Sequence, residues 1–228
     1  MSAHEVVSAK VMDLHTQRTA TSQEGDDVFV TVETGALRGV VSTSHNGTLY
    51  SKFVGIPFAT PPLGDLRFLQ GVDHAPTPAA SWTGTRDALS YGSRCPQKGR
   101  GSEDCLYVNV YAPLVNDSSP LAVMVNIHGG GYTTGSSRFR RPDFFMDKGV
   151  LLVTFNYRLG SIGFLSLQND DIPGNAGLKD QVFTLQWVQH NIAAFGGDPD
   201  KVTIFGESTG GSSTSHLFLS PAAKGLRL

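Results

Sequence analysis

Five residues near the end of the chain have a spacing that suits nucleophilic chemistry. They form a G-x-S-x-G motif made of Gly206, Glu207, Ser208, Thr209 and Gly210. A buried-strand pattern, VTIF (202–205), precedes the motif, and a segment able to form a helix (208–219) follows it. In that setting the motif makes a tight, strained turn that projects the serine hydroxyl, and its glycines leave room where strand and helix crowd together. The setting favours Ser208 as a nucleophile; a Gly/Ser-rich helix cap is the alternative.

A second glycine motif, HGGGY (128–132), directly follows the apolar run LAVMVNI (121–127). Acyl transfer develops negative charge on a carbonyl oxygen, and preorganised backbone N–H groups stabilise that charge. Consecutive glycines let the chain bend so that the amides of Gly130 and Gly131 face inward, with the amide of Thr209 as a third donor. A flexible loop or a phosphate nest is the alternative, but the nest needs a G-K-[ST] continuation that is absent. The motif therefore favours an oxyanion hole.

The composition is that of an ordinary globular chain. Of 228 residues, 39% are hydrophobic and 17% are charged, and the net charge is −2. The 18 Lys and Arg are spread among 20 Asp and Glu, which argues against a surface for nucleic acid or an anionic membrane. No apolar run approaches the roughly 20 residues that span a bilayer. These features favour a small neutral ligand, with no metal or cofactor, and leave the oligomeric state open.

The first 27 residues lack the apolar core of a secretory signal, and Glu5 and Asp13 argue against a mitochondrial transit peptide. We expect residues 1–27 to form an N-terminal arm that is disordered or holds a short helix. Without a visible export signal the chain as written is expected in the cytoplasm, and it would be secreted if the true start lies upstream.

Two cysteines, Cys95 and Cys105, have a C-x9-C spacing that matches no zinc pattern, so they are either buried thiols or a small disulfide. Two N-x-[ST] sequons, at Asn46 and Asn116, lie in turn-like sequence and are candidates for glycosylation. A disulfide would imply export, in conflict with the missing signal.

The remaining pattern predicts an α/β fold. Short β-branched and aromatic runs at 28–33, 37–43 and 49–56 indicate an antiparallel β-meander, and the Pro- and Gly-rich stretch 56–84 indicates a long surface loop. Runs that are apolar on both faces indicate interior strands. These runs are 106–113, 121–127, 150–158 and 202–205.

An amphipathic helix is predicted before FGGDP (195–199), because apolar residues recur there at helical spacing. They are Leu178, Val182, Leu185, Val188 and Ile192. Strands that alternate with helices imply a doubly wound, mostly parallel sheet. No repeat or linker divides residues 28–228, so one domain is expected.

From about Val28 to Leu226 the chain resembles the type-B carboxylesterases of the α/β-hydrolase fold. The similar segments follow the family's order: GIPFATPPLGDLRF, SEDCLYVNVYAP, HGGGY, VTFNYRLGSIGFLS, PGNAGLKDQVFTLQWVQHNIAAFGGDPDKVTIFGESTGG and HLFLSPAAKGL. Together they are far more specific than either motif alone. The segment from PGN to GESTGG is most similar to insect general esterases.

The resemblance implies a serine esterase that acts through an acyl-enzyme, with Ser208 as nucleophile and Gly130, Gly131 and Thr209 as oxyanion-hole donors. It also implies that Glu207 lines the gorge leading to the nucleophile. A solvated or helix-start carboxylate is the alternative for Glu207.

The same resemblance implies a disulfide between Cys95 and Cys105, and an ion pair of Arg67 with Glu103 that supports the disulfide loop. This loop is much shorter than in cholinesterases and has no aromatic residue, which disfavours choline esters. Thr209 stands where relatives usually have Ala and could narrow the acyl pocket, and GESTG differs from the GQSAG typical of juvenile hormone esterases. Small neutral carboxylic esters are therefore the expected substrates.

The family supplies an acidic residue and a catalytic His later in the chain, and residues 1–228 offer no substitute. Seven histidines occur: His4, His15, His45, His74, His128, His190 and His216. His216 would lie roughly 12 Å along the helix from Ser208, and Asp198 and Asp200 would lie at the wrong end of the strand. His128 alone is at the right end of the sheet, where the resemblance assigns it to shaping the oxyanion loop.

We therefore expect the 228-residue chain to be an N-terminal portion that turns over little or no ester by itself. We also expect it to be poorly soluble alone, because the strand at 202–205 would be an unpaired edge. Two other hypotheses stay open: a non-catalytic, ligand-binding or adhesion relative of the esterases, and a fragment without stable activity.

Overall fold

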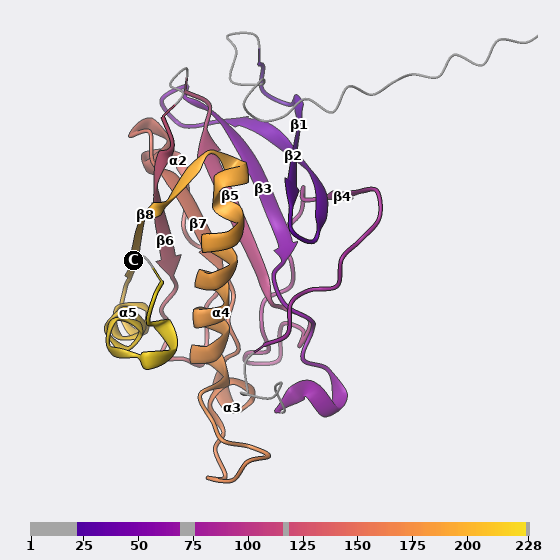
Figure 1. Ribbon diagram of the computed structural model, residues 1–228, viewed down its shortest axis with the longest axis vertical. Coiled ribbons are helices and arrows are strands. Elements are labelled where there is room, and N and C mark those ends of the chain that lie inside the picture. The colour runs from indigo at the N-terminus through magenta and orange to yellow at the C-terminus, as the bar shows by residue number, and fades with distance from the viewer. Residues whose placement is uncertain (1–21, 69–75, 116–118, 227–228) are drawn as a thin grey trace, which may run out of the picture.

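The computed structural model describes residues 22–68, 76–115 and 119–226. Within these ranges eight strands form one mixed sheet, in the order β1-β2-β3-β5-β7-β6-β8 with β4 paired to β2 (Figure 1). Residues 1–21 of the predicted arm (1–27) lie outside the described residues. Strand β1 begins at Asp27, the last residue of that predicted arm.

The first strands form the predicted antiparallel meander. They are β1 (Asp27–Val32), β2 (Gly35–Thr43) and β3 (Leu49–Pro57). The antiparallel part extends further than the sequence predicted, because β5 (Tyr107–Pro113) is antiparallel to both β3 and β7 (Leu151–Phe155). A short strand that the sequence did not predict, β4 (Thr85–Asp87), joins β2 in parallel. All three of its residues are exposed, so no burial pattern marks it.

The parallel part of the sheet positions both glycine motifs. Strand β6 (Leu121–Ile127) lies between β7 and β8 (Gly197–Gly206) and is parallel to both. Because Ile127 pairs with Gly206, the two strands end at the same edge of the sheet. The HGGGY motif leaves β6 at this point and the G-x-S-x-G motif leaves β8, so two segments about 80 residues apart become neighbours.

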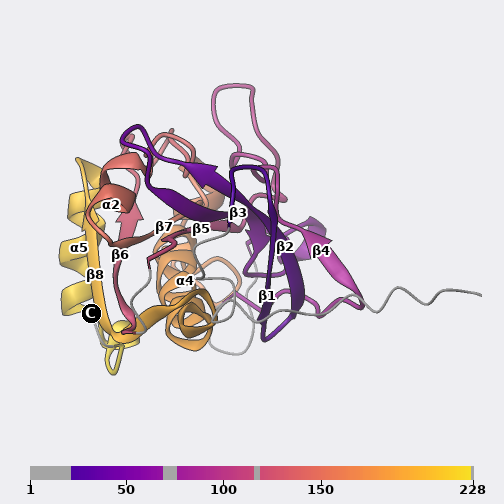
Figure 2. The ribbon, with the colours of Figure 1, turned by 90° about the horizontal axis from the view of Figure 1, so that it is seen from above.

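Helices cover both faces of the sheet, as Figure 2 shows with α4 and α2 on opposite sides. Helices α4 (Ala176–Asn191) and α5 (Thr209–Leu219) contribute to the main apolar core, through Leu185 and Val188 of α4 and Leu217 of α5. Helix α2 (Asp143–Asp147) contributes Met146 to a smaller core with Tyr111 and Leu152. Short helical turns complete the chain: η1 (Gly64–Arg67), α3 (Gly160–Phe164), η2 (Ile192–Phe195) and η3 (Pro221–Ala223).

The predicted helix before FGGDP is α4, and it is followed by η2, whose C-cap is Gly196 with a φ of 82°. Its buried side differs from the predicted apolar stripe, because Leu178 and Val182 are only half-buried. Polar side chains take much of the buried side instead, among them Asp180, Gln181 and Thr184. Each of these needs a hydrogen-bond partner from the fold.

The predicted surface loop at 56–84 contains η1, and its residues 69–75 lie outside the described residues. None of the helices in the described ranges combines the length and apolar character that crossing a bilayer would require.

Candidate active site

Ser208 lies on the tight turn between β8 and α5. Its backbone has φ 56° and ψ −123°, a strained conformation for a residue with a side chain. The glycines on either side allow this turn, because a Cβ atom at Gly206 would lie 2.4 Å from the carbonyl carbon of Gly210. A Cβ atom at Gly210 would lie 2.1 Å from the carbonyl oxygen of Ile127 in β6. The strand, the helix start and the neighbouring strand thus meet around Ser208, which is exposed.

The glycine-rich loop after β6 lies directly against this turn. A Cβ atom at Gly129 would approach the carbonyl oxygen of Glu207 to 2.6 Å and the Cβ of Ser208 to 3.2 Å. Gly130 and Gly131 have φ values of 116° and 64°, which favour glycine, and Tyr132 follows at 56°. The loop therefore bends sharply where it passes the serine.

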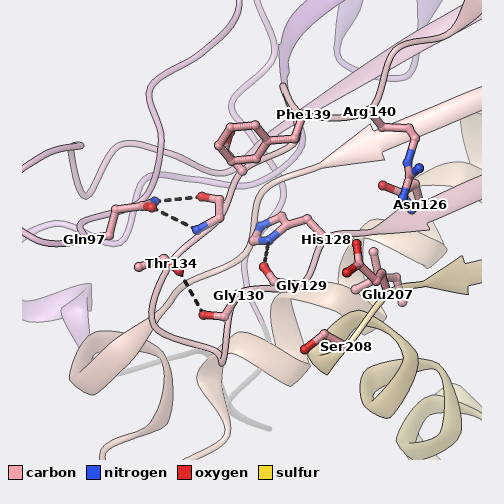
Figure 3. A pocket seen from close by; sticks show the side chains of 13 residues that line it. Gln97, Asn126, His128, Gly129, Gly130, Thr134, Phe139, Arg140, Glu207 and Ser208 are labelled. Atoms are coloured by element: carbon pink, nitrogen blue, oxygen red, sulfur yellow. Dashed lines mark hydrogen bonds between the residues drawn. The ribbon is translucent and has the colours of Figure 1, made fainter.

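Thr133 and Thr134 hold the bend in the glycine-rich loop. Their amides donate to the Gly130 carbonyl at 3.1 and 3.0 Å, and the hydroxyl of Thr134 donates to the same oxygen at 3.1 Å (Figure 3). In a planar trans peptide the next N–H group points away from the carbonyl. The N–H of Gly131 consequently points away from these threonines.

His128 is buried at the base of this loop. Its Nδ1 lies 2.9 Å from the Gly129 carbonyl oxygen, so Nδ1 carries the proton and Nε2 is the lone-pair nitrogen. Its ring stacks on Tyr157 at 4.4 Å, and the Tyr157 hydroxyl donates to the His128 carbonyl at 2.7 Å. Nε2 is buried without a hydrogen-bond partner among the described residues. The imidazole is thus neutral, and in this form it holds the glycine-rich loop in place.

Burial lowers the pKa of His128 to about 4, against the opposing effect of the hydrogen bond to Gly129. The unfolded chain, with a His pKa near 6.5, binds a proton first as the pH falls. His128 should therefore lower the free energy of unfolding by about 3 kcal/mol between pH 7 and pH 4. Denaturant unfolding of wild type and His128→Gln across this range measures the effect, because the carboxylates are common to both proteins. If the difference in the free energy of unfolding between the two proteins stayed constant with pH, the prediction would be wrong.

A cavity of about 600 Å³ opens between the two motifs. Of the residues predicted for the site, Ser208, Gly130 and Glu207 line it, as Figure 3 shows, whereas Gly131 and Thr209 do not. Glu207 is exposed there and makes no salt bridge with the described residues. The nucleophile candidate Ser208 and the Glu207 carboxylate thus face the same accessible cavity.

Further residues of the cavity come from segments that the sequence did not single out for the site. Gln97 comes from the disulfide loop, Asn126 from the end of β6, and Phe139 and Arg140 from the loop after Ser137. The Arg140 guanidinium lies over the ring of Phe205 at 5.9 Å. Only the position of Asn126, two residues before the HGGGY motif, could have suggested a place in the site.

None of the histidines in the described part of the chain is hydrogen-bonded to the Ser208 hydroxyl, which has no hydrogen-bond partner there. His216 lies on α5 and its Nε2 is 3.3 Å from the Ser212 hydroxyl. His190 lies 3.6 Å from Glu33, and His45 lies in the turn between β2 and β3. His4, His15 and His74 lie outside the described residues.

The two aspartates near the start of β8 lie at the end of this strand away from Ser208. Asp198 pairs with Lys201 at 3.2 Å and accepts from the amide of Asp200 at 2.9 Å. Neither is placed to act with the serine, as the sequence led us to expect.

The predicted disulfide between Cys95 and Cys105 is present. The Arg67 guanidinium lies 2.8 Å from the carboxylate of Glu103, which forms the predicted ion pair. Asn46 is exposed and its side-chain amide donates to Asp147 at 2.6 Å, while Asn116 lies outside the described residues.

Comparison with known proteins gives consistent matches. Residues 26–227 match the model of the carboxylesterase family. Juvenile hormone esterase of Tribolium castaneum is 50% identical over 203 residues, covering 84% of this chain and 34% of that protein. Esterase B1 of Culex pipiens is 46% identical over 209 residues, covering 86% of this chain and 38% of that protein.

Solved structures match as well. A crystal structure of juvenile hormone esterase from Manduca sexta, with OTFP covalently attached, gives a TM-score of 0.80 at 41% identity. That match covers 88% of this chain and 39% of the other. The chain thus spans only about a third to two-fifths of the length of these relatives.

Proposed function

Because the chain belongs to the carboxylesterase family, we propose that this protein hydrolyses small neutral carboxylic esters with Ser208 as the nucleophile. The chain has the α/β-hydrolase fold of the esterases, and it covers only part of the length of those proteins. Proteins named juvenile hormone esterase and esterase B1 are both similar to it. Only the first of those names states a substrate, so we propose the ester class and no single compound.

One observation carries the proposal: the strained turn at Ser208 lies against Gly129, at the wall of a cavity. Strain of this kind costs free energy and persists where the surrounding structure enforces it, as it does at many active sites. A helix cap, the alternative for this motif, requires neither the strain nor the contact with a second glycine loop.

In the proposed reaction the Ser208 Oγ attacks the ester carbonyl carbon and its proton passes to a general base. The carbonyl oxygen becomes an oxyanion, to which the amides of Gly130, Gly131 and Thr209 donate. Collapse of this intermediate expels the alcohol, which takes the proton, and leaves an acyl-enzyme. Water then attacks the acyl carbon, releases the acid and restores Ser208.

We propose that the general base and its acidic partner come from residues outside those described. A base must lie within about 3 Å of the proton that it accepts, and no described imidazole is hydrogen-bonded to Ser208. The 228-residue chain alone should therefore hydrolyse esters poorly.

The test uses the protein translated from the complete transcript, with the 228-residue chain as a comparison. We expect a burst of p-nitrophenol from p-nitrophenyl acetate, then turnover, and labelling of the Ser208 peptide by an organophosphate. Ser208→Ala should abolish labelling and lower kcat by roughly 10⁴-fold or more.

The matched control is Ser215→Ala, which removes an exposed hydroxyl from α5 and should leave the burst unchanged. A folded complete protein with neither burst nor labelling would reject the proposal and favour a non-catalytic, ligand-binding relative. Bursts of equal size from wild type and Ser208→Ala would also reject it.

A further inference from the structure

Gln97, in the loop closed by the disulfide, links that loop to the glycine-rich loop. Its side-chain amide pairs with the backbone of Gly135 in both directions (Figure 3). Nε2 donates to the Gly135 carbonyl at 2.7 Å, and the Gly135 amide donates to Oε1 at 2.9 Å. Nε2 also donates to the Cys95 carbonyl at 3.0 Å. Both N–H groups and the oxygen of this side chain are therefore engaged.

The disulfide loop gives Gln97 a rigid base. Gln97 and Arg100 exchange backbone hydrogen bonds of 2.8 and 2.9 Å, which close a tight turn. Lys98 and Gly99 between them have positive φ values of 41° and 71°, as a type I′ turn requires. The Asn156 side chain donates to the carbonyl of Cys105 at 3.1 Å and so ties the end of the loop to β7. The side chain of Gln97 thus extends from a fixed position.

Gly135 passes this constraint to the glycine-rich loop. A Cβ atom at Gly135 would lie 2.4 Å from the Gly129 carbonyl oxygen and 2.4 Å from Nδ1 of His128, so the two backbones are in direct contact. The next residue toward the loop is Thr134, whose amide and hydroxyl hold the Gly130 carbonyl. That carbonyl sets the direction of the Gly131 amide. A continuous path therefore runs from Gln97 to the proposed oxyanion donors.

We infer that Gln97 is a positioning residue for the ester hydrolysis proposed above, on which this inference rests. Gln97 holds Gly135 in place and, through Thr134, fixes the Gly130–Gly131 peptide beside Ser208. Donors stabilise a developing oxyanion only when they are fixed in advance. A looser loop should therefore slow acylation and change substrate binding little.

The first experiment compares Gln97→Ala with Arg100→Ala, a control in the same loop whose exposed side chain is not hydrogen-bonded to Gly135. For Gln97→Ala we expect the acylation rate constant for p-nitrophenyl acetate to fall about tenfold, less than the roughly 100-fold loss of a deleted donor. KM should change by less than about twofold. Amide hydrogen exchange across 129–137 should become faster in this variant alone.

A second variant separates positioning from a general loss of stability. In Gln97→Glu the ionised carboxylate keeps the shape of the side chain but faces the carbonyl oxygens of Cys95 and Gly135 without a hydrogen to donate. Protonation restores one donor. The acylation rate of this variant relative to wild type should thus rise as the pH is lowered from 8 to 5.

The outcomes separate the two proposals. If the wild type is active and Gln97→Ala has the same acylation rate and the same hydrogen exchange as the wild type, the inference is overturned. A constant ratio of Gln97→Glu to wild type across this pH range also counts against it. A wild type without esterase activity overturns the proposed function, and faster exchange in Gln97→Ala would then assign Gln97 to holding the loop only.

Discussion

Gly210→Ala is expected to lower kcat/KM for a p-nitrophenyl ester by roughly 100-fold or more. The added Cβ would lie 2.1 Å from the Ile127 carbonyl oxygen and 3.0 Å from its carbon. These are backbone atoms of β6, which is hydrogen-bonded to strands on both sides and cannot move aside alone. The start of α5 must shift instead, and Ser208 shifts with it. A displacement of about 1 Å at a reacting group suffices for a loss of this size.

Gly211→Ala is the matched control, one residue further along the same helix. Its Cβ would lie 3.3 Å from the Gly206 carbonyl oxygen, so the neighbour needs to give by only a few tenths of an ångström. Alanine also favours a helix over glycine by about 1 kcal/mol. We expect kcat/KM close to wild type. If folded Gly210→Ala matched wild type in kcat/KM, the close approach to β6 would not be what positions Ser208.

Asp180→Asn is expected to lower the free energy of unfolding by roughly 3–5 kcal/mol. Its carboxylate accepts three hydrogen bonds from Arg158: from Nε at 2.8 Å, from Nη2 at 2.7 Å and from the backbone amide at 2.9 Å. Both side chains are almost fully buried, at 2% and 0% exposed. The asparagine would leave the guanidinium charge in the interior without the Asp180 carboxylate, which is the costly way to break a buried pair.

The exposed pair of Arg38 with Asp87 is the control, because it has the same two-bond geometry at 2.8 and 2.9 Å. Asp87→Asn should change stability little, since solvent screens this pair. Chemical denaturation of Asp180→Asn and Asp87→Asn compares their free energies of unfolding. The double variant Arg158→Met/Asp180→Leu should recover much of the loss, because it leaves no buried charge. Equal stability of Asp180→Asn and wild type would show that the interior tolerates the guanidinium without the Asp180 carboxylate.

The local elements of the fold were accessible from sequence because their signals lie within a few residues. Alternating β-branched runs gave the meander, and β-rich apolar runs gave β5, β6, β7 and β8. The direction of β5 was not accessible, because an apolar strand has the same composition whether its neighbours run parallel or antiparallel. Strand β4 was missed for a related reason, since it pairs with β2, about 50 residues earlier.

The buried side of α4 shows where sequence patterns fail. Apolar spacing found the helix, yet polar residues fill much of its inner side. Gln181 donates to Ser213 of α5 at 3.0 Å, and Ser213 lies 3.1 Å from the Tyr132 hydroxyl. Asn191 accepts from the amide of Glu33 at 2.9 Å. Such residues are read as solvent-facing until their partners, from other elements, are known.

The sequence by itself determined the family, most of the strands, helix α4 and the positions of the two glycine motifs. Those features depend on backbone sterics and side-chain type over short stretches, and these are properties of neighbouring residues. Only the tertiary structure decided which groups meet: Gly129 against Ser208, Gln97 with Gly135, and Arg158 with Asp180. Each contact joins segments 22 or more residues apart, and Gly129 meets Ser208 because β6 and β8 end at the same edge of the sheet. A local sequence pattern does not predict contacts between distant segments, because a buried polar group gains its partner only when the chain folds.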